Sequence, residues 1–295
     1  MPMKNAFLTL LAAAAAMAAA AGTIELKTAV SSCRIDLEGA RIVSFRTDGE
    51  EVLWNDRQSQ PCTARWAHGG IPICWPRFGV DESGAIHGFA WRRPFALRSR
   101  RDGPTRSEAV LALADGDARL EYTVVLTDAL TLEATTVNAG TNEWACSFGF
   151  HPYLRVAESA KSSVEGADGL SFEDDPSRER PERGVWKGTI RIDDSIDRIF
   201  KLPDAPRSVF TLDDAAGGRR IVVAGEGASH LNVWNPGPAK NCPGTISGDG
   251  WRHFVCVEPI FVGGVDGRPV PLPPGERRTL KMTIWAKTRV GKDGR

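Results

Sequence analysis

The chain has 295 residues, of which 42% are hydrophobic, and its 37 basic residues are balanced by 37 acidic ones. This length and composition allow a substantial buried core, in one large domain or two small ones. The formal net charge of zero gives no sign of a nucleic-acid footprint or of attraction to an anionic membrane, so we expect a small-molecule partner.

The N-terminal residues have the pattern of an exported protein. One lysine precedes an apolar run from Ala6 to about Ala21, and small residues near Ala21 and Gly22 would suit cleavage. We predict a signal peptide over residues 1–21 and an exported, periplasmic protein; an alanine-rich helix in a cytoplasmic protein is the alternative. No later stretch approaches the ~20 apolar residues of a membrane span, so we expect no membrane association after leader removal.

Six cysteines would permit disulfides after export, and the sequence does not choose among their pairings. Cys146 and Cys256 lie within apolar runs, where a cysteine is usually a small buried hydrophobe. No CxxC motif or histidine-rich cluster is present, so we expect no metal site.

Short strand-like segments, separated by glycine, aspartate, asparagine and proline, dominate from Thr23 onward. Several alternate apolar and polar residues at the spacing of two that half-buried strands require. We find no amphipathic helix, no repeat and no linker, and predict one all-β domain over residues 22–295, a large antiparallel β-sandwich. The predicted strands cover 23–30, 33–38, 40–45, 51–54, 95–100, 108–113, 120–127, 130–140, 144–154, 190–200, 208–214, 219–227, 230–237, 253–262 and 278–287.

Two stretches interrupt this series. Gly69 to Phe95 contains paired glycines and several prolines, which predicts a shaped loop with short extended pieces, of the kind that often carries function. Glu158 to Lys187 is the most polar stretch, and we predict a mobile surface excursion there.

Three residues stand in unusual contexts. His87 lies in the Gly69 to Phe95 loop, and His151 ends an apolar strand just before a proline. Glu258 is set within the apolar run FVCVEPIF, where a carboxylate must be paired, hydrogen-bonded or neutral. A carboxyl with a raised pKa would suit a general base, whereas a buried structural carboxylate paired with an arginine is the alternative.

Six motifs occur in an order that resembles the aldose 1-epimerase (galactose mutarotase) superfamily, and more closely its hexose-6-phosphate mutarotase branch. They are GGIPICWPRFG, HGFA, GFHPYL, SIDRIF, VWNPG and VCVEP, and the resemblance runs from about Thr23 to Ala286. It implies a β-supersandwich fold, no required cofactor, and interconversion of the α and β anomers of a sugar or sugar phosphate. We expect a monomer that acts as a glucose-6-phosphate 1-epimerase. An aldose 1-epimerase for free sugars, or a non-catalytic carbohydrate-binding domain, are the alternatives.

The resemblance also implies roles for individual residues. His151 would be the general acid and Glu258 the general base, while His87 and Asp197 would bind the sugar and Trp234 and Asn235 would line the cleft.

The chain departs from the branch in one motif that bears on phosphate binding. The branch typically has an arginine directly after HGFA, where this chain has Trp91, with Arg92 and Arg93 following. A shift of one residue turns a side chain to the other face of a strand. Because the arginine fork suits a phosphate monoester, we predict Arg77 and Arg92 as the phosphate clamp.

Overall fold

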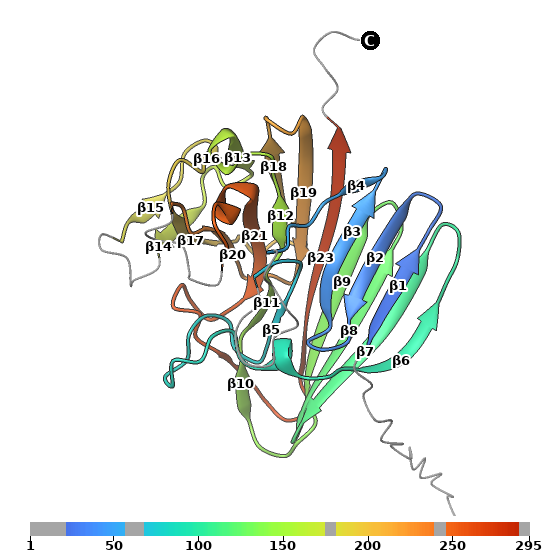
Figure 1. Cartoon of the computed structure of the whole chain (residues 1–295). Helices are drawn as coiled ribbons and strands as arrows, with labels where there is room; N and C mark the ends of the chain where they lie inside the picture. Colours follow the sequence, from blue (N-terminus) through green and yellow to red (C-terminus); the bar gives the residue numbers. More distant parts are fainter. Residues whose placement is uncertain (1–21, 57–67, 175–180, 239–245, 289–295) are drawn as a thin grey trace, which may run out of the picture.

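A computed structural model describes residues 22–56, 68–174, 181–238 and 246–288 (Figure 1). Within these ranges the chain forms antiparallel sheets and contains no α-helix, which confirms the predicted fold class. No helix in the same ranges is long and apolar enough to cross a membrane. The leader, Cys62 and Cys242 lie outside the described residues. Three short 3-10 helices are present: η1 (Ala90–Arg92), η2 (Ser159–Lys161) and η3 (Gly250–His253).

Two large sheets carry most of the strands. The nine-stranded sheet runs in the order β16 (Ile190–Arg191), β13 (Ser162–Glu165), β18 (Ser208–Asp214), β19 (Arg219–Glu226), β23 (Arg277–Thr288), β9 (Leu130–Asn138), β8 (Ala118–Leu126), β7 (Ser107–Asp115) and β6 (Ala96–Arg101). The eight-stranded sheet runs in the order β15 (Arg183–Val185), β14 (Ser171–Asp174), β17 (Ile196–Lys201), β20 (His230–Asn235), β21 (Phe254–Phe261), β11 (Phe148–Phe150) and β5 (Ile73–Cys74), and β12 (Tyr153–Arg155) also pairs with β21.

Two smaller sheets complete the fold. One pairs β10 (Trp144–Cys146) with β22 (Val270–Leu272). The other contains β1 (Thr23–Lys27), β2 (Ser31–Asp36), β3 (Arg41–Thr47) and β4 (Glu50–Glu51), and it lies beside β7 and β8 (Figure 1).

The alternating strands of the nine-stranded sheet behave as their sequence predicts. In β8, the buried side chains are Leu120, Tyr122, Val124 and Leu126, and the residues between them are more exposed. The register places Val124 opposite Leu132 of β9, so buried residues meet buried residues across the pair. This apolar face joins residues of the eight-stranded and four-stranded sheets in one continuous core.

The strand β21 differs because it is buried on both faces. Val255 and Val257 point into the main core. Side chains alternate along a strand, so Cys256 and Glu258 must face the other way. On that second face Cys256 packs in a separate small cluster with Tyr153 and Phe254. The predicted functional carboxylate therefore lies on the face of the eight-stranded sheet that does not meet the main core.

The loop from Gly69 to Phe95 is shaped as predicted and is tied to the sheets. Trp75 is fully buried and its indole nitrogen donates to Thr136 Oγ1 of β9 over 2.9 Å. Gly88 has a positive φ of 66°, and a Cβ there would lie 2.4 Å from the carbonyl oxygen of Trp75. Only glycine allows the chain to pass so closely there.

The prediction of a mobile excursion from Glu158 to Lys187 was wrong for the residues that the structure describes there. They include β13, β14 and β15, all paired within the large sheets. Val164 and Ala167 are buried in the main core. The strands are short and carry many polar residues, so no clear alternation marked them in the sequence.

The cysteines that the structure describes are Cys33, Cys74, Cys146 and Cys256. All four are buried free thiols. The prediction that Cys146 and Cys256 are small buried residues is confirmed.

Candidate active site

His151 and Glu258 converge on the second face of the eight-stranded sheet. His151 follows the end of β11, and its backbone N–H donates to the carbonyl of Pro72 over 3.1 Å, which ties the strand end to the loop. Glu258 lies in β21 beside β20, with Asn232 directly opposite it. His151 Nε2 lies 3.7 Å from Glu258 Oε1, and the two side chains are 6% and 0% exposed. The structure therefore brings together the two residues predicted to be acid and base.

The site disfavours charge on both members of this pair. Burial raises the pKa of Glu258 well above its usual 4.5, the negative charge of Asp197 raises it further, and the hydrogen bond from Asn232 opposes the rise. Burial lowers the pKa of His151 well below 6.5, and the neighbouring His87 and His68 lower it further. Both directions favour the neutral pair, in which the one shared proton sits on Glu258 and not on His151.

Glu258 has unused hydrogen-bonding capacity. Asn232 Nδ2 donates to Glu258 Oε1 over 3.2 Å. The other carboxyl oxygen, Oε2, is buried and has no hydrogen-bond partner among the described residues, and the same holds for Asn232 Oδ1. Buried polar atoms are normally satisfied, so unsatisfied ones at a site point to a ligand.

His87 lies beside His151, with ring centroids 5.4 Å apart. Its backbone is left-handed, with φ of 57°. The backbone N–H of Gly79 donates to His87 Nδ1 over 3.1 Å, and burial lowers the His87 pKa to about 3. The ring is therefore neutral with its proton on Nε2, which makes it a hydrogen-bond donor rather than an acid.

Aromatic rings surround His151. It stacks on Tyr153 at 4.7 Å between ring centroids, and Trp234 meets it edge-on at 5.6 Å. His68 adds a third imidazole, since its Nδ1 lies 2.8 Å from the Tyr153 hydroxyl and its ring stacks on Trp234 at 6.1 Å. Burial lowers the His68 pKa to about 4. These rings fix the orientation of His151 and exclude water from it.

Asp197 and Asn235, both predicted to contact the sugar, differ in their surroundings. Asp197 of β17 lies opposite Trp234 in the register, is half-buried, and acts electrostatically on Glu258. Asn235 is 1% exposed, and its amide donates to the backbone carbonyls of Trp251 and Phe254. The Asn235 amide is thus occupied in holding η3 and β21.

The arginines predicted to clamp a phosphate are not equivalent. Arg77 donates from Nη2 to the Val80 carbonyl over 3.3 Å, at the turn that carries His87, and its buried Nε has no hydrogen-bond partner among the described residues. Arg92 is exposed, with its guanidinium 5.5 Å from the centroid of Trp91. Arg93 pairs with Asp115 at 3.5 Å.

Trp91 occupies the position where the resembling branch carries an arginine. Its indole donates to the backbone carbonyls of Ile86 and Gly88, and its ring packs against the small apolar cluster of Phe78 and its neighbours. The side chain therefore closes the His87 turn onto the sheet.

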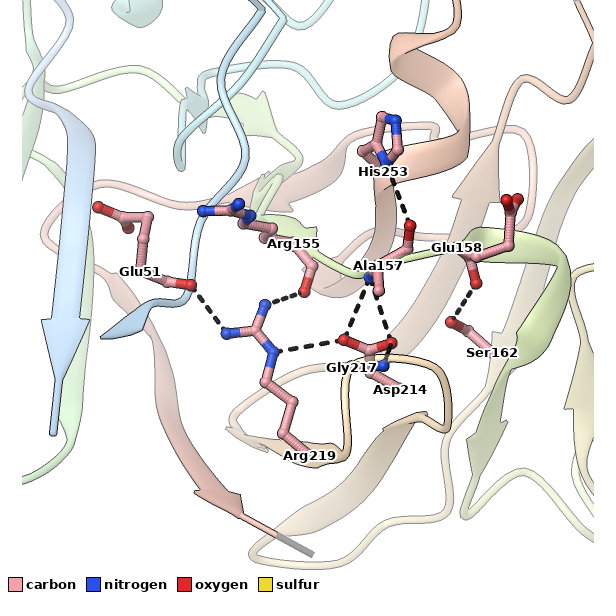
Figure 2. Close-up of polar contacts among 9 residues, drawn as sticks. All are labelled: Glu51, Arg155, Ala157, Glu158, Ser162, Asp214, Gly217, Arg219 and His253. Carbon is pink, nitrogen blue, oxygen red and sulfur yellow. Dashed lines mark hydrogen bonds and ion pairs between the residues drawn. The ribbon is translucent and has the colours of Figure 1, made fainter. Parts of the chain in front are cut away.

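A second feature, an open hollow of about 1230 Å³, lies at the far end of β12. Figure 2 shows its polar frame, in which Asp214 and Arg219 bind each other and the backbone of Ala157 and Arg155. None of the predicted site residues lines this hollow. The polar groups of its frame hydrogen-bond to one another and hold the surrounding loops in place.

The sequence analysis missed three residues of the site. They are His68, Tyr153 and Asn232, whose contacts, except the stacking of Tyr153 on nearby His151, join positions far apart in the sequence. A partial signal existed for Asn232, because it is two residues before Trp234 and thus shares its face of the strand.

The chain is an antiparallel β-sandwich protein with a buried histidine–carboxylate pair on one sheet face, an arrangement suited to acid–base chemistry on a small molecule. The aldose 1-epimerase family model matches residues 22–285, so the chain belongs to this family. It is 31% identical over 242 residues to a protein of Salmonella typhimurium provisionally named glucose-6-phosphate 1-epimerase, covering 76% of this chain and 78% of that one. A protein of Cenchrus ciliaris with the same provisional name is 26% identical over 285 residues, with 89% and 84% covered.

Solved structures agree with this assignment. A crystal structure from Salmonella typhimurium, provisionally named a mutarotase, superposes with a TM-score of 0.79 at 26% identity and covers 90% of each chain. A galactose mutarotase-like protein from Clostridium acetobutylicum has a TM-score of 0.70 at 15% identity, with 90% of this chain and 95% of that one covered. The second likeness supports the fold alone. The predicted superfamily and fold are confirmed.

Proposed function

We propose that this protein is a hexose-6-phosphate 1-epimerase that interconverts the anomers of glucose 6-phosphate or a close relative. The observation that carries the proposal is the buried His151–Glu258 pair, 3.7 Å apart, with one carboxyl oxygen left without a partner among the described residues. The names of the relatives in Salmonella typhimurium and Cenchrus ciliaris support the substrate class.

The closeness of the pair suits the reaction. In a cyclic sugar the ring oxygen and the anomeric hydroxyl are bonded to the same carbon, C1, so the two catalytic groups must converge on one point. Ring opening removes the hydroxyl proton and adds a proton to the ring oxygen. Glu258 would take the first proton and His151 would donate the second.

The proton balance closes over one cycle. Opening starts from the less favoured state, with the shared proton on His151, and leaves Glu258 protonated, His151 neutral and the sugar as an aldehyde. After rotation about C1–C2, Glu258 returns its proton to the carbonyl oxygen while His151 takes the proton from the attacking hydroxyl. No net proton is consumed, which is compatible with a site that shields a single proton from water. An acid and a base of this kind are each worth about 10²–10⁴ in rate.

Other residues would bind rather than transfer protons. His87 would donate from Nε2 to the sugar, and Asp197 would accept from a hydroxyl. Trp234 would present an apolar ring to the sugar face. The backbone bonds of the Asn235 amide argue for a structural role, so we assign it no sugar contact.

Phosphate binding would fall to Arg77. It lies at the turn that holds His87, and its guanidinium retains donors for a phosphate. Arg92 is exposed and lies against Trp91, so we assign the main part of the clamp to Arg77. A free aldose as the substrate remains the second candidate, favoured by the outward position of Arg92 and Arg93.

Polarimetry tests the proposal. Freshly dissolved α-glucose 6-phosphate should lose its excess rotation much faster with the protein than in buffer, and faster than glucose or galactose does under the same conditions. Acceleration with free sugars alone would replace the first candidate by the second. No acceleration with any of the three would leave a non-catalytic carbohydrate-binding domain.

A further inference from the structure

The thiol of Cys256 takes no part in the proposed proton transfers, although it lies in the wall of the same site. Cys256 is two residues before Glu258 on β21, so both side chains leave the same face of the strand. Ligand atoms of His151, Cys256 and Glu258 all lie within 4.8 Å of one another, and all three residues are buried. An imidazole, a thiol and a carboxyl are thus gathered in one small volume.

These three groups are the kinds of ligand that bind a soft or borderline divalent cation. Zinc accepts thiolate, imidazole and carboxylate ligands, and three protein ligands leave a fourth position open. With bonds of about 2.0–2.3 Å, tetrahedral zinc holds neighbouring ligand atoms roughly 3.3–3.7 Å apart. His151 Nε2 and Glu258 Oε1 are 3.7 Å apart, a few tenths of an ångström more than the roughly 3.3–3.5 Å that zinc imposes on one nitrogen and one oxygen ligand. Closing the rest of the triangle requires side-chain movements of about 1 Å.

Two further contacts favour an ion at this position. Asn232 donates to Glu258 Oε1 over 3.2 Å and so orients the carboxyl from behind, as outer-shell partners of metal ligands do. The other carboxyl oxygen, Oε2, is buried without a hydrogen-bond partner among the described residues. Glu258 can therefore bind a cation through Oε1, which lies 3.7 Å from His151 Nε2 and keeps a second lone pair beside the Asn232 bond, or through Oε2.

We propose that His151, Cys256 and Glu258 form a site for Zn²⁺ or a similarly soft divalent cation, and that the bound metal competes with the sugar. Binding releases the thiol proton and the proton shared by His151 and Glu258, and forms one metal bond to sulfur, one to nitrogen and one to oxygen. The metal occupies both groups that ring opening requires. It is therefore an inhibitor of the proposed epimerase and not its cofactor.

Cobalt provides a readout that does not depend on activity. The whole purified chain, freed of metal with a chelator, is titrated with Co²⁺ and followed for the thiolate-to-metal charge-transfer band. In parallel, Zn²⁺ is titrated into the polarimetric assay, with Mg²⁺ as a hard cation for comparison. We expect the Co²⁺ band, inhibition by Zn²⁺, and no inhibition by Mg²⁺.

Two cysteine variants locate the site. Cys256→Ser should abolish the band and raise the inhibitory Zn²⁺ concentration at least ~10-fold, since losing a direct ligand costs no less than losing an outer-shell one. Cys74→Ser is the matched control, because Cys74 is equally buried and also lies near Glu258 but is not part of the triad. It should change neither result. If Cys256→Ser melts early, Cys256→Ala gives the same comparison.

An unchanged band and unchanged Zn²⁺ inhibition in the Cys256 variants would overturn the proposal, as would the absence of a band in the native chain. These outcomes are separate from those of the proposed function. If the native chain does not accelerate mutarotation at all, the epimerase proposal fails while the Co²⁺ band still decides the metal site.

Discussion

Two buried carboxylates in this protein have opposite surroundings. Asp214 is 1% exposed, and it accepts hydrogen bonds from the backbone of Ala157 and Gly217 and from Arg219, as Figure 2 shows. Glu258 is 0% exposed and, among the residues that the structure describes, has one hydrogen-bond donor, Asn232, with His151 at 3.7 Å. The first carboxylate is saturated and holds loops in place. The second is left with capacity to react, which is what a catalytic group requires.

The largest expected effect comes from removing the reactive carboxylate. Glu258→Gln keeps the shape and should reduce the rate of mutarotation by about 10²–10⁴, because the proposed base is lost. Polarimetry measures the change. Unchanged mutarotation would mean that Glu258 is a structural carboxylate like Asp214.

The same variant should be more stable than the native protein at neutral pH. The pKa of Glu258 is raised on folding, so its stabilising contribution is complete below about pH 4.5 and declines as the pH rises above that value. The advantage of Glu258→Gln should therefore grow from pH 5 to pH 8 in thermal melts. A constant difference across this range would contradict the raised pKa.

Removing the charge of Asp214 should lower the stability of the protein without changing its mutarotation rate. Asp214→Asn leaves the partly buried Arg219 without its ion pair, and we expect a loss of about 3 kcal/mol in the free energy of unfolding. Glu165→Gln is the matched control, since its pair with Arg220 is exposed and should be worth less than about 1 kcal/mol. Urea denaturation gives both values. The mutarotation rate per folded molecule should stay unchanged in both variants.

His87 should make the stability of the protein depend on pH in the acid range. His87 takes up its proton at a pH of about 3 in the folded state, against the usual 6.5. As the pH falls from 6.5 toward 3, His87 is protonated in the unfolded chain but stays neutral in the folded chain. This residue therefore lowers the free energy of unfolding by up to about 1.4 kcal/mol per pH unit. His87→Asn removes the titration while tolerating the left-handed backbone. The urea midpoint should fall less between pH 7 and pH 5 in this variant than in the native protein. An equal fall in both proteins would contradict the prediction.

The smallest effect concerns selectivity. Arg77→Met should lower kcat/KM for glucose 6-phosphate by about ten- to hundredfold, the value of a charge-assisted hydrogen bond, and leave glucose unaffected. Arg92→Gln should have a smaller effect. Arg93→Gln is the control, because Arg93 pairs with Asp115. An equal loss on both substrates in Arg77→Met would show that this arginine maintains the turn and does not bind phosphate.

Much of this architecture could be read from local sequence. Alternation in Ala118 to Leu126 predicted a half-buried strand because the period of two is a property of the strand itself. Glu258 stood out because a carboxylate in an apolar run needs a special environment. His151 stood out because the proline that follows it ends the strand.

The remaining site residues depend on register, which the local sequence does not contain. Asn232 binds Glu258 only because β20 and β21 pair with these two residues opposite each other. His68 reaches Tyr153 across 85 positions of the chain. Asn235 was recognised from its motif and predicted to line the cleft. Its hydrogen bonds to the backbone of Trp251 and Phe254 could not be predicted, because they depend on how distant segments pack. Pairings of this kind are set by the packing of whole sheets.

Because β21 is buried on both faces, its residues and those of the exposed loop should differ in how freely they can change during evolution. Glu258, the proposed base, belongs to an interior strand whose neighbours on either side fix its position, so its identity and orientation tolerate little variation. The tip of the turn that precedes His87, Glu82 to Gly84, is exposed, so substitutions there cost little. On the proposed function, sugar preference can therefore change at this tip while the His151–Glu258 pair stays in place.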